Sequence, residues 1–339
     1  MLVGVSEIAS ACAIGSKGLR RSRGLRCSKG SSVTALVDSI TRRRFVWLAA
    51  LTGGSLALSG CAGDGSNGTG GSTGVDGSGG EGAGDGQNPE DAAVAARAAV
   101  DERIGAMTLE QKVAQLFIVT PEALVEGVSQ VTQAGDMTRE GVTAHPVGGI
   151  VYFAQNLLDP EQTTTMLANV KQFYADAGNV APFIAVDEEG GTVVRVADNE
   201  AFGAQDVGDA SALGSAGDTE AAKRAAEQIA DYLMPLGFNL DFAPVADVVD
   251  PLRSDTMGLR SFSSDAAVAA DMVRAEVEGF RDKKMLCCAK HFPGIGAAAG
   301  DSHEGAITIE ATNEELETVD LVPLRAAIEA DRKSTRLNS

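Results

Sequence analysis

From about residue 90 onwards, the chain alternates short apolar runs with longer segments in which apolar residues recur at helical spacing. The short runs are rich in residues that favour β-structure, and the pattern predicts a strand in each of them. These predicted strands cover residues 113–120, 149–154, 182–186, 238–248 and 285–292.

The segments between these runs predict helices, which we place at residues 159–178, 218–235, 264–281 and 313–330. Asp218 is a good N-cap for the second of them, and Gly237 is a good C-cap. Repeated strand–helix units indicate parallel strands that are covered by helices.

Polar residues gather where the predicted strands end, as at Asp187 and Lys290. Functional residues at the carboxyl ends of many strands favour a (β/α)₈ barrel of the TIM type over a doubly wound sheet, which would gather its ligand contacts at one switch point. Five strands are too few for eight, so we expect the barrel to be incomplete at its C-terminal end. Residues 331–339 are polar and basic, which indicates a foreign tail or a disordered terminus.

The first part of the chain has the pattern of an export signal and a tether. Residues 42–44 are arginines, followed by an apolar run at 46–58 and by Leu-Ser-Gly-Cys ending at Cys61. This order indicates a signal peptide, resembles a twin-arginine signal and a lipobox, and predicts lipidation at Cys61. Residues 62–89 are dominated by Gly, Ser and Asp and predict a flexible linker. We therefore divide the chain at 1–61, 62–89, 90–330 and 331–339, and we expect an exported, membrane-anchored lipoprotein.

The charge of the chain is strongly asymmetric. The whole chain has 28 basic and 47 acidic residues, and residues 1–61 hold nine of the basic but only two of the acidic ones. The remaining residues are therefore strongly acidic, which argues against nucleic acid as a partner. The neighbours Cys287 and Cys288 lie in an apolar run, and we interpret them as buried strand residues.

The densest candidate chemistry lies between residues 290 and 303. Lys290 and His291 end an apolar run, and Asp301 stands two residues before His303. A carboxylate so placed can accept a hydrogen bond from the imidazole and leave the other ring nitrogen to exchange a proton near neutral pH.

These and other motifs together resemble glycoside hydrolase family 3, in its β-N-acetylglucosaminidase branch. The resemblance covers about residues 108–330 and rests on the order of six motifs: Gln115-Leu116-Phe117, Gly148-Gly149-Ile150-Val151, Val186-Asp187-Glu188-Glu189-Gly190-Gly191 with Arg195, Asn239-Leu240-Asp241-Phe242-Ala243-Pro244-Val245-Ala246-Asp247-Val248, Arg260-Ser261-Phe262, and Lys290-His291-Phe292-Pro293-Gly294 with Asp301-Ser302-His303.

The resemblance implies a retaining hydrolase that removes terminal β-linked N-acetylglucosamine from oligosaccharides and needs no metal or organic cofactor. It implies that His303 is the general acid/base and that Asp301 orients it. The residues that it implies for sugar binding are Asp187, Arg195, Arg260, Lys290 and His291. We expect Glu188 and Glu189 to be structural, Asp241 and Asp247 to brace loops, and the protein to be a monomer.

Two departures from the family pattern matter. Ile295 stands where the family usually has a second histidine. The nucleophilic aspartate of the family belongs to a strand–loop unit beyond Ser339, and without it no glycosyl-enzyme intermediate can form. We therefore expect these 339 residues alone to be inactive.

Four other functions remain open from the sequence. The same fold supports a β-glucosidase, or a phosphorylase in which phosphate replaces water. A surface lipoprotein that binds sugar without catalysis would not need Asp301 and His303. A metal site with these two residues as ligands is the fourth alternative.

Overall fold

The computed structural model describes residues 89–252, 256–298, 308–309 and 311–333. The described residues from Thr108 onwards belong to one compact unit. The helix α2 (Pro89–Ala106) belongs to a second unit. In the part of the chain that the structure describes, no helix has both the length and the apolar character that crossing a bilayer requires.

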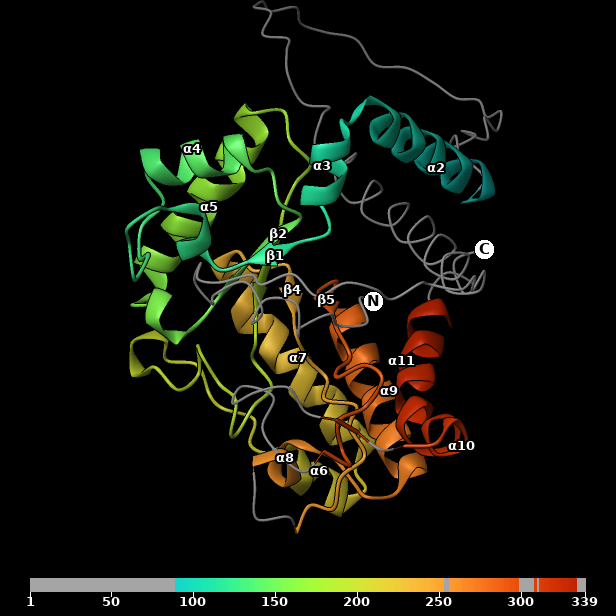
Figure 1. The fold of residues 1–339 in the computed structure, drawn as a ribbon. Coiled ribbons are helices and arrows are strands. Elements are labelled where there is room, and N and C mark those ends of the chain that lie inside the picture. The colour runs from blue at the N-terminus through green and yellow to red at the C-terminus, as the bar shows by residue number, and fades with distance from the viewer. Residues whose placement is uncertain (1–88, 253–255, 299–307, 310, 334–339) are drawn as a thin grey trace, which may run out of the picture. The chain divides into compact units, whose positions relative to one another are not determined.

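Five parallel strands form one sheet in the order of the chain, from β1 to β5 (Figure 1). The strands are β1 (Ile118–Val119), β2 (Gly149–Tyr152), β3 (Phe183–Val186), β4 (Leu240–Asp241) and β5 (Leu286–Cys287). Each strand pairs in parallel with the next one, so every connection crosses over through helical segments. This is the strand order of a (β/α)₈ barrel and not of a doubly wound sheet, in which the order reverses.

The helices that cover the sheet follow the strands one by one. The long ones are α4 (Asp136–Ala144), α5 (Pro160–Asp176), α7 (Thr219–Leu236), α9 (Ala266–Asp282) and α11 (Leu321–Lys333). α9 packs between α7 and α11, and the three run side by side in Figure 1. The shorter elements are α3 (Leu109–Ala114), η2 (Pro121–Leu124), η3 (Ala154–Asn156), η4 (Glu200–Phe202), α6 (Ala210–Ala216), α8 (Thr256–Arg260), α10 (Asn313–Glu315) and η5 (Leu316–Asp320).

The two faces of the sheet bury different sets of side chains. On β3, Ile184 and Val186 pack into the large core with the helices, while Ala185 packs on the opposite face. Cys287 and Cys288 likewise lie on opposite faces, and both are buried, as predicted. Because side chains alternate along a strand, residues that continue this alternation past the strand ends point to a predictable side.

The predicted helices at 159–178, 218–235 and 264–281 are confirmed, with Asp218 as the N-cap and Gly237 as the C-cap of α7. The last predicted helix contains a turn of π-helix at residues 316–320 before α11 begins.

Of the predicted strand at 113–120, only Ile118–Val119 is a strand, and its first two residues belong to α3. Thr108 forms a capping box with Gln111, which starts a helix where the apolar run alone indicated a strand. The predicted strands at 238–248 and 285–292 are much shorter in the structure. They continue as irregular pairing, in which the N–H of Lys290 donates to Pro244 and Val245 bridges to Lys290.

Candidate active site

The candidate site lies where β3, β4 and β5 end and the following segments begin. Asp187 follows β3 directly, Asp247 follows β4, and Lys290 and His291 come after β5. Asp187 continues the alternation of Ala185, and Lys290 continues that of Cys288, so both belong to the face away from the helices. Arg260 is the last residue of α8, which lies between β4 and α9 in the chain.

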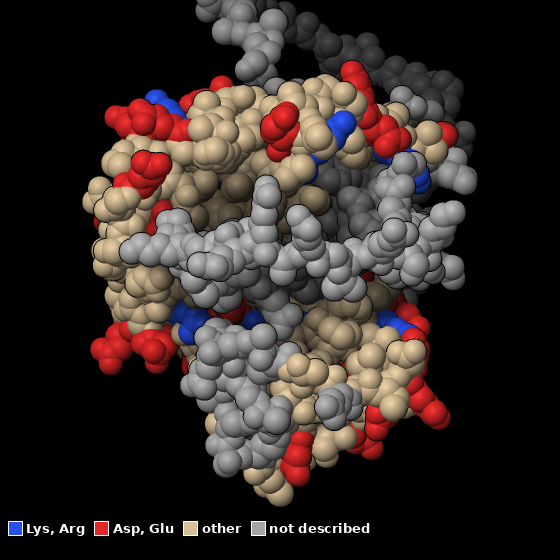
Figure 2. Space-filling view, in the orientation of Figure 1, with Lys and Arg blue, Asp and Glu red and all other residues tan. Residues whose placement is uncertain are grey.

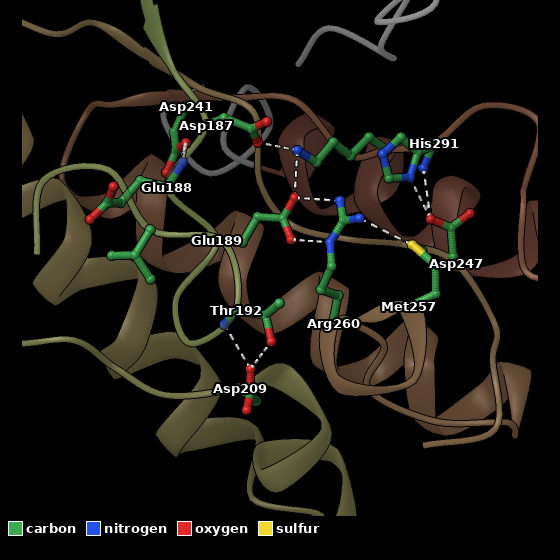
Figure 3. A network of polar contacts seen from close by, with 12 residues as sticks. Asp187, Glu188, Glu189, Thr192, Asp209, Asp241, Asp247, Met257, Arg260 and His291 are labelled. Carbon is green, nitrogen blue, oxygen red and sulfur yellow. Dashed lines mark hydrogen bonds and ion pairs between the residues drawn. The ribbon is translucent and has the colours of Figure 1, made fainter. Parts of the chain in front are cut away.

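Four charged side chains form one connected cluster, shown in Figure 3. The Lys290 Nζ donates to the Asp187 carboxylate and also lies 2.6 Å from Glu189 Oε1. The Arg260 guanidinium forms a bidentate ion pair with Glu189, in which Nε donates to Oε2 at 2.7 Å and Nη2 donates to Oε1 at 2.7 Å. Glu189 is therefore the centre that joins the two cations, whereas the sequence predicted only a structural role for it.

The cluster is largely shielded from solvent. The side chains of Lys290 and Glu189 are 4% and 5% exposed, and that of Asp187 is 22% exposed. Burial by itself raises the pKa of Glu189, but Lys290 and Arg260 outweigh that effect and lower it to about 2. Burial lowers the pKa of Lys290, and Asp187 and Glu189 outweigh this and raise it. Both groups therefore stay ionised over the physiological pH range.

Within the part of the chain that the structure describes, the cluster has N–H donors without a partner, which are available to a ligand. A guanidinium has five N–H groups, and Arg260 uses one on Met257 Sδ and two on Glu189, which leaves two. An ammonium has three, and Lys290 uses two of them. Asp187 has a second carboxylate oxygen that can accept, and its side chain is more exposed than that of Glu189. Such a mixture of fixed donors and acceptors suits hydroxyl groups, which both donate and accept.

His291 is tied to Asp247 and not to the four-membered cluster. Its Nδ1 lies 2.6 Å from Asp247 Oδ2, and its backbone N–H donates to the same oxygen at 3.3 Å. The other oxygen of Asp247 accepts from the N–H of Ile295 at 2.8 Å. The predicted bracing role of Asp247 is confirmed.

Two further carboxylates hold the segment that carries Asp187. Asp241 Oδ1 accepts from the N–H of Glu188 at 3.0 Å, so it also braces a loop as predicted. Glu188 is structural, as expected: it accepts from the Tyr232 hydroxyl at 2.9 Å and from three backbone N–H groups, those of residues 195–197. Asp241 Oδ2 is buried without a hydrogen-bond partner, and burial raises the pKa of Asp241 well above its usual range.

Arg195 lies apart from this network. Its guanidinium is 5.9 Å from the centre of the Phe153 ring, and its Nη1 donates to the carbonyl of Val194 at 3.3 Å. Its Nε is buried without a partner. Arg195 thus keeps a donor that no described residue uses.

Several predicted residues cannot be placed. Asp301, His303 and Cys61 lie outside the described residues, so their roles stay predictions. Within the described ranges, no group of three or more His, Cys, Asp or Glu side chains is arranged to hold a metal ion.

Comparison with known proteins gives the family. The model of the glycosyl hydrolase family 3 N-terminal domain matches residues 108–335. The chain belongs to glycosyl hydrolase family 3. The N-terminal domain of this family is a TIM-type barrel, which confirms the predicted fold class.

Two similar proteins are covered only in part by this family 3 chain. It is 32% identical over 227 residues to the β-hexosaminidase LpqI of Mycobacterium tuberculosis, covering 64% of this chain and 51% of that protein. It is also similar to the solved structure of a family 3 β-N-acetylglucosaminidase from Paenibacillus, with 37% identity and a TM-score of 0.59 over 66% of this chain and 40% of that one. The family 3 chain therefore spans about half, or less, of the length of these relatives.

Proposed function

We propose that the protein is a retaining β-N-acetylhexosaminidase that hydrolyses terminal β-linked N-acetylglucosamine, and that the described cluster binds the sugar at the non-reducing end. The observation that carries this proposal is the joining of Asp187, Lys290 and Arg260 through Glu189 at one end of the parallel sheet. The names of the similar proteins, β-hexosaminidase and β-N-acetylglucosaminidase, support the choice of sugar.

In this proposal, the four ionised side chains hold the sugar hydroxyls, and His291 and Arg195 complete the binding site. His303 exchanges the proton with the glycosidic oxygen, and Asp301 orients its ring. The enzyme uses no cofactor, and it acts as a monomer. A retaining mechanism also requires a nucleophile, and we assign that role to no residue of this chain.

The test is to measure binding of N-acetylglucosamine and of glucose by calorimetry. We expect N-acetylglucosamine to bind more tightly, and we expect K290Q to abolish binding because it removes the ammonium between two carboxylates. K283Q is the matched control, since Lys283 forms an exposed ion pair with Asp231. Equal affinity for the two sugars would favour the β-glucosidase alternative, and unchanged binding by K290Q would contradict the proposed site.

Turnover is the second readout. The proposal predicts that p-nitrophenyl N-acetyl-β-glucosaminide is hydrolysed by a protein whose site contains a nucleophile. A rate that depends on phosphate, with a sugar phosphate as the product, would favour the phosphorylase alternative.

We also propose that the protein is exported and anchored through a lipid on Cys61. The support is in the sequence: three arginines, an apolar run and Leu-Ser-Gly-Cys, followed by a polar linker. Expression in a bacterium that processes lipoproteins, with labelled palmitate, tests this. C61A should lose the label and leave the membrane fraction, and a labelled C61A protein would contradict the proposal.

A further inference from the structure

The buried carboxylate of Asp247 contacts both the backbone and the ring of His291. Asp247 has 1% of its surface exposed, and its own carbonyl accepts from the hydroxyl of Ser261 at 2.7 Å. Its carboxylate accepts from two backbone N–H groups of the 291–295 segment and lies 2.6 Å from Nδ1 of the His291 ring. The ring therefore sits against a partner that cannot rotate away without breaking these bonds.

A carboxylate in contact with several N–H donors acts as an acceptor. The 2.6 Å contact with Asp247 Oδ2 therefore requires His291 Nδ1 to carry the proton. The His291 side chain is 16% exposed, and its Nε2 has no hydrogen-bond partner among the described residues. This nitrogen is left to a ligand.

We propose that Asp247 is a positioning residue, which holds a proton on Nδ1 of His291 and thereby presents Nε2 as an acceptor for a ligand hydroxyl. The neighbouring Lys290 and Arg260 offer N–H donors, so an acceptor beside them lets one sugar hydroxyl accept from a cation and donate to the imidazole. The identity of the ligand rests on the proposed function, but the tautomer does not.

The tautomer can be measured directly, because the chain has only three histidines. Long-range ¹H–¹⁵N NMR spectra of the ¹⁵N-labelled full chain distinguish the protonated from the unprotonated ring nitrogen, and H145Q and H303Q assign the signals. At pH 7.5 we expect His291 to be protonated at Nδ1 alone. A ring protonated at Nε2 alone, or at both nitrogens, would overturn the proposal.

The variant D247N separates positioning from mere packing. In D247N the amide group can donate to Nδ1 while its oxygen keeps the 2.8 Å bond from Ile295, at the cost of only the longer 3.3 Å bond from the His291 backbone N–H. D247N should therefore invert the tautomer and leave Nε2 as a donor. D320N is the matched control, because the Asp320 carboxyl lies against Gly294 in the same segment and makes no hydrogen bond to the ring. D320N should keep the Nδ1–H form, and the same inversion in D320N would contradict the assignment to Asp247.

Sugar affinity gives the functional readout. We expect D247N to weaken N-acetylglucosamine binding in calorimetry roughly 2- to 10-fold, the equivalent of one hydrogen bond, and D320N to leave it unchanged. Unchanged affinity in a D247N protein with an inverted tautomer would overturn the acceptor role of Nε2. If the unmodified chain bound no sugar, the proposed function would fail, while the tautomer measurement would still decide the positioning role.

Discussion

Glu189 is the residue whose replacement should damage the cluster most, and E189Q is the variant that shows it. The carboxylate receives three charged contacts of 2.6–2.7 Å, two from Arg260 and one from Lys290. A glutamine keeps one accepting oxygen and turns an N–H₂ group towards a cation. At least one cation then loses its partner in a place where water cannot replace it.

The cost can be scaled from the burial of the three groups. The side chains are 4–13% exposed, so solvent screens the lost charge very little. Removing one partner of a buried ion pair costs about 3–5 kcal/mol, and we expect about 3 kcal/mol, because Asp187 still pairs with Lys290. For a unit of this size that corresponds to a fall in Tm of roughly 6–12 °C. Urea titrations followed by circular dichroism measure the free energy, and thermal scans measure Tm.

The control for E189Q is D231N. Asp231 and Lys283 form an ion pair of similar length, 2.7 Å, but their side chains are 62% and 34% exposed. Such a surface pair contributes at most about 1 kcal/mol. If E189Q lowered the free energy of unfolding no more than D231N does, the buried cluster would not be the structural centre of the site.

The pH dependence gives an independent check on E189Q. The pKa of Glu189 is lowered to about 2 in the folded chain, from its ordinary value of 4.5. Its stabilisation is therefore fully present above pH 4.5 and is lost as the pH falls from there towards 2. The difference between the unmodified chain and E189Q should shrink in the same interval, and a constant difference would refute the charge-based explanation.

Substitutions at three other buried residues should change the stability of the protein in predictable ways. Burial raises the pKa of Glu276 to about 8, so its contribution to stability is present below pH 4.5 and is lost as the pH rises to about 8. In urea titrations between these pH values, the free energy of unfolding should fall by up to about 1.4 kcal/mol per pH unit. E276Q should remove this pH dependence. Burial raises the pKa of Asp241 and so favours its neutral form, and D241N should therefore leave the urea midpoint nearly unchanged. D241A should cost about 1–3 kcal/mol, and equal damage by both variants would mean that the carboxyl is ionised. A Cβ at Gly214 would lie 1.7 Å from the Phe262 carbonyl oxygen, so G214A should lower Tm and weaken sugar binding, while G135A, where nothing lies within 4 Å, should do neither.

The part of the fold that the sequence predicted best is the part where local signals agree with the packing. The helix α7 has an N-cap, a C-cap and one apolar face, and its predicted position is correct. The β4 region illustrates the opposite case. Its apolar run extends over residues 238–248, but only Leu240 and Asp241 pair regularly, because the next residues form irregular hydrogen bonds with the segment after β5. Such pairing depends on a partner more than forty residues away, and local composition does not reveal it.

In the candidate site, too, the features set by local sequence were predictable and those set by distant contacts were not. The alternation of side chains past the strand ends correctly places Asp187 and Lys290 on one face. Alternation also puts Glu189, two residues after Asp187, on the same face. Because three acidic residues follow one another here, the sequence did not indicate which of them belong to the site. The contact with Arg260 spans 71 positions in the sequence and is set by where α8 lies. For Asp247 the sequence indicated a brace but not that the braced group is His291.

The balance of charge in the site bears on the choice between water and phosphate as the acceptor. Asp187 and Glu189 match Lys290 and Arg260 charge for charge, so the described cluster presents no net positive charge that would attract an anion. A neutral sugar fits such a cluster better than phosphate does. Arg195 is different, because no described carboxylate pairs with it and its buried Nε has no partner. A phosphorylase would therefore depend on Arg195 for phosphate, whereas a hydrolase would use the same donor for the sugar. R195Q should then abolish a dependence on phosphate in the first case, and should weaken N-acetylglucosamine binding without phosphate in the second.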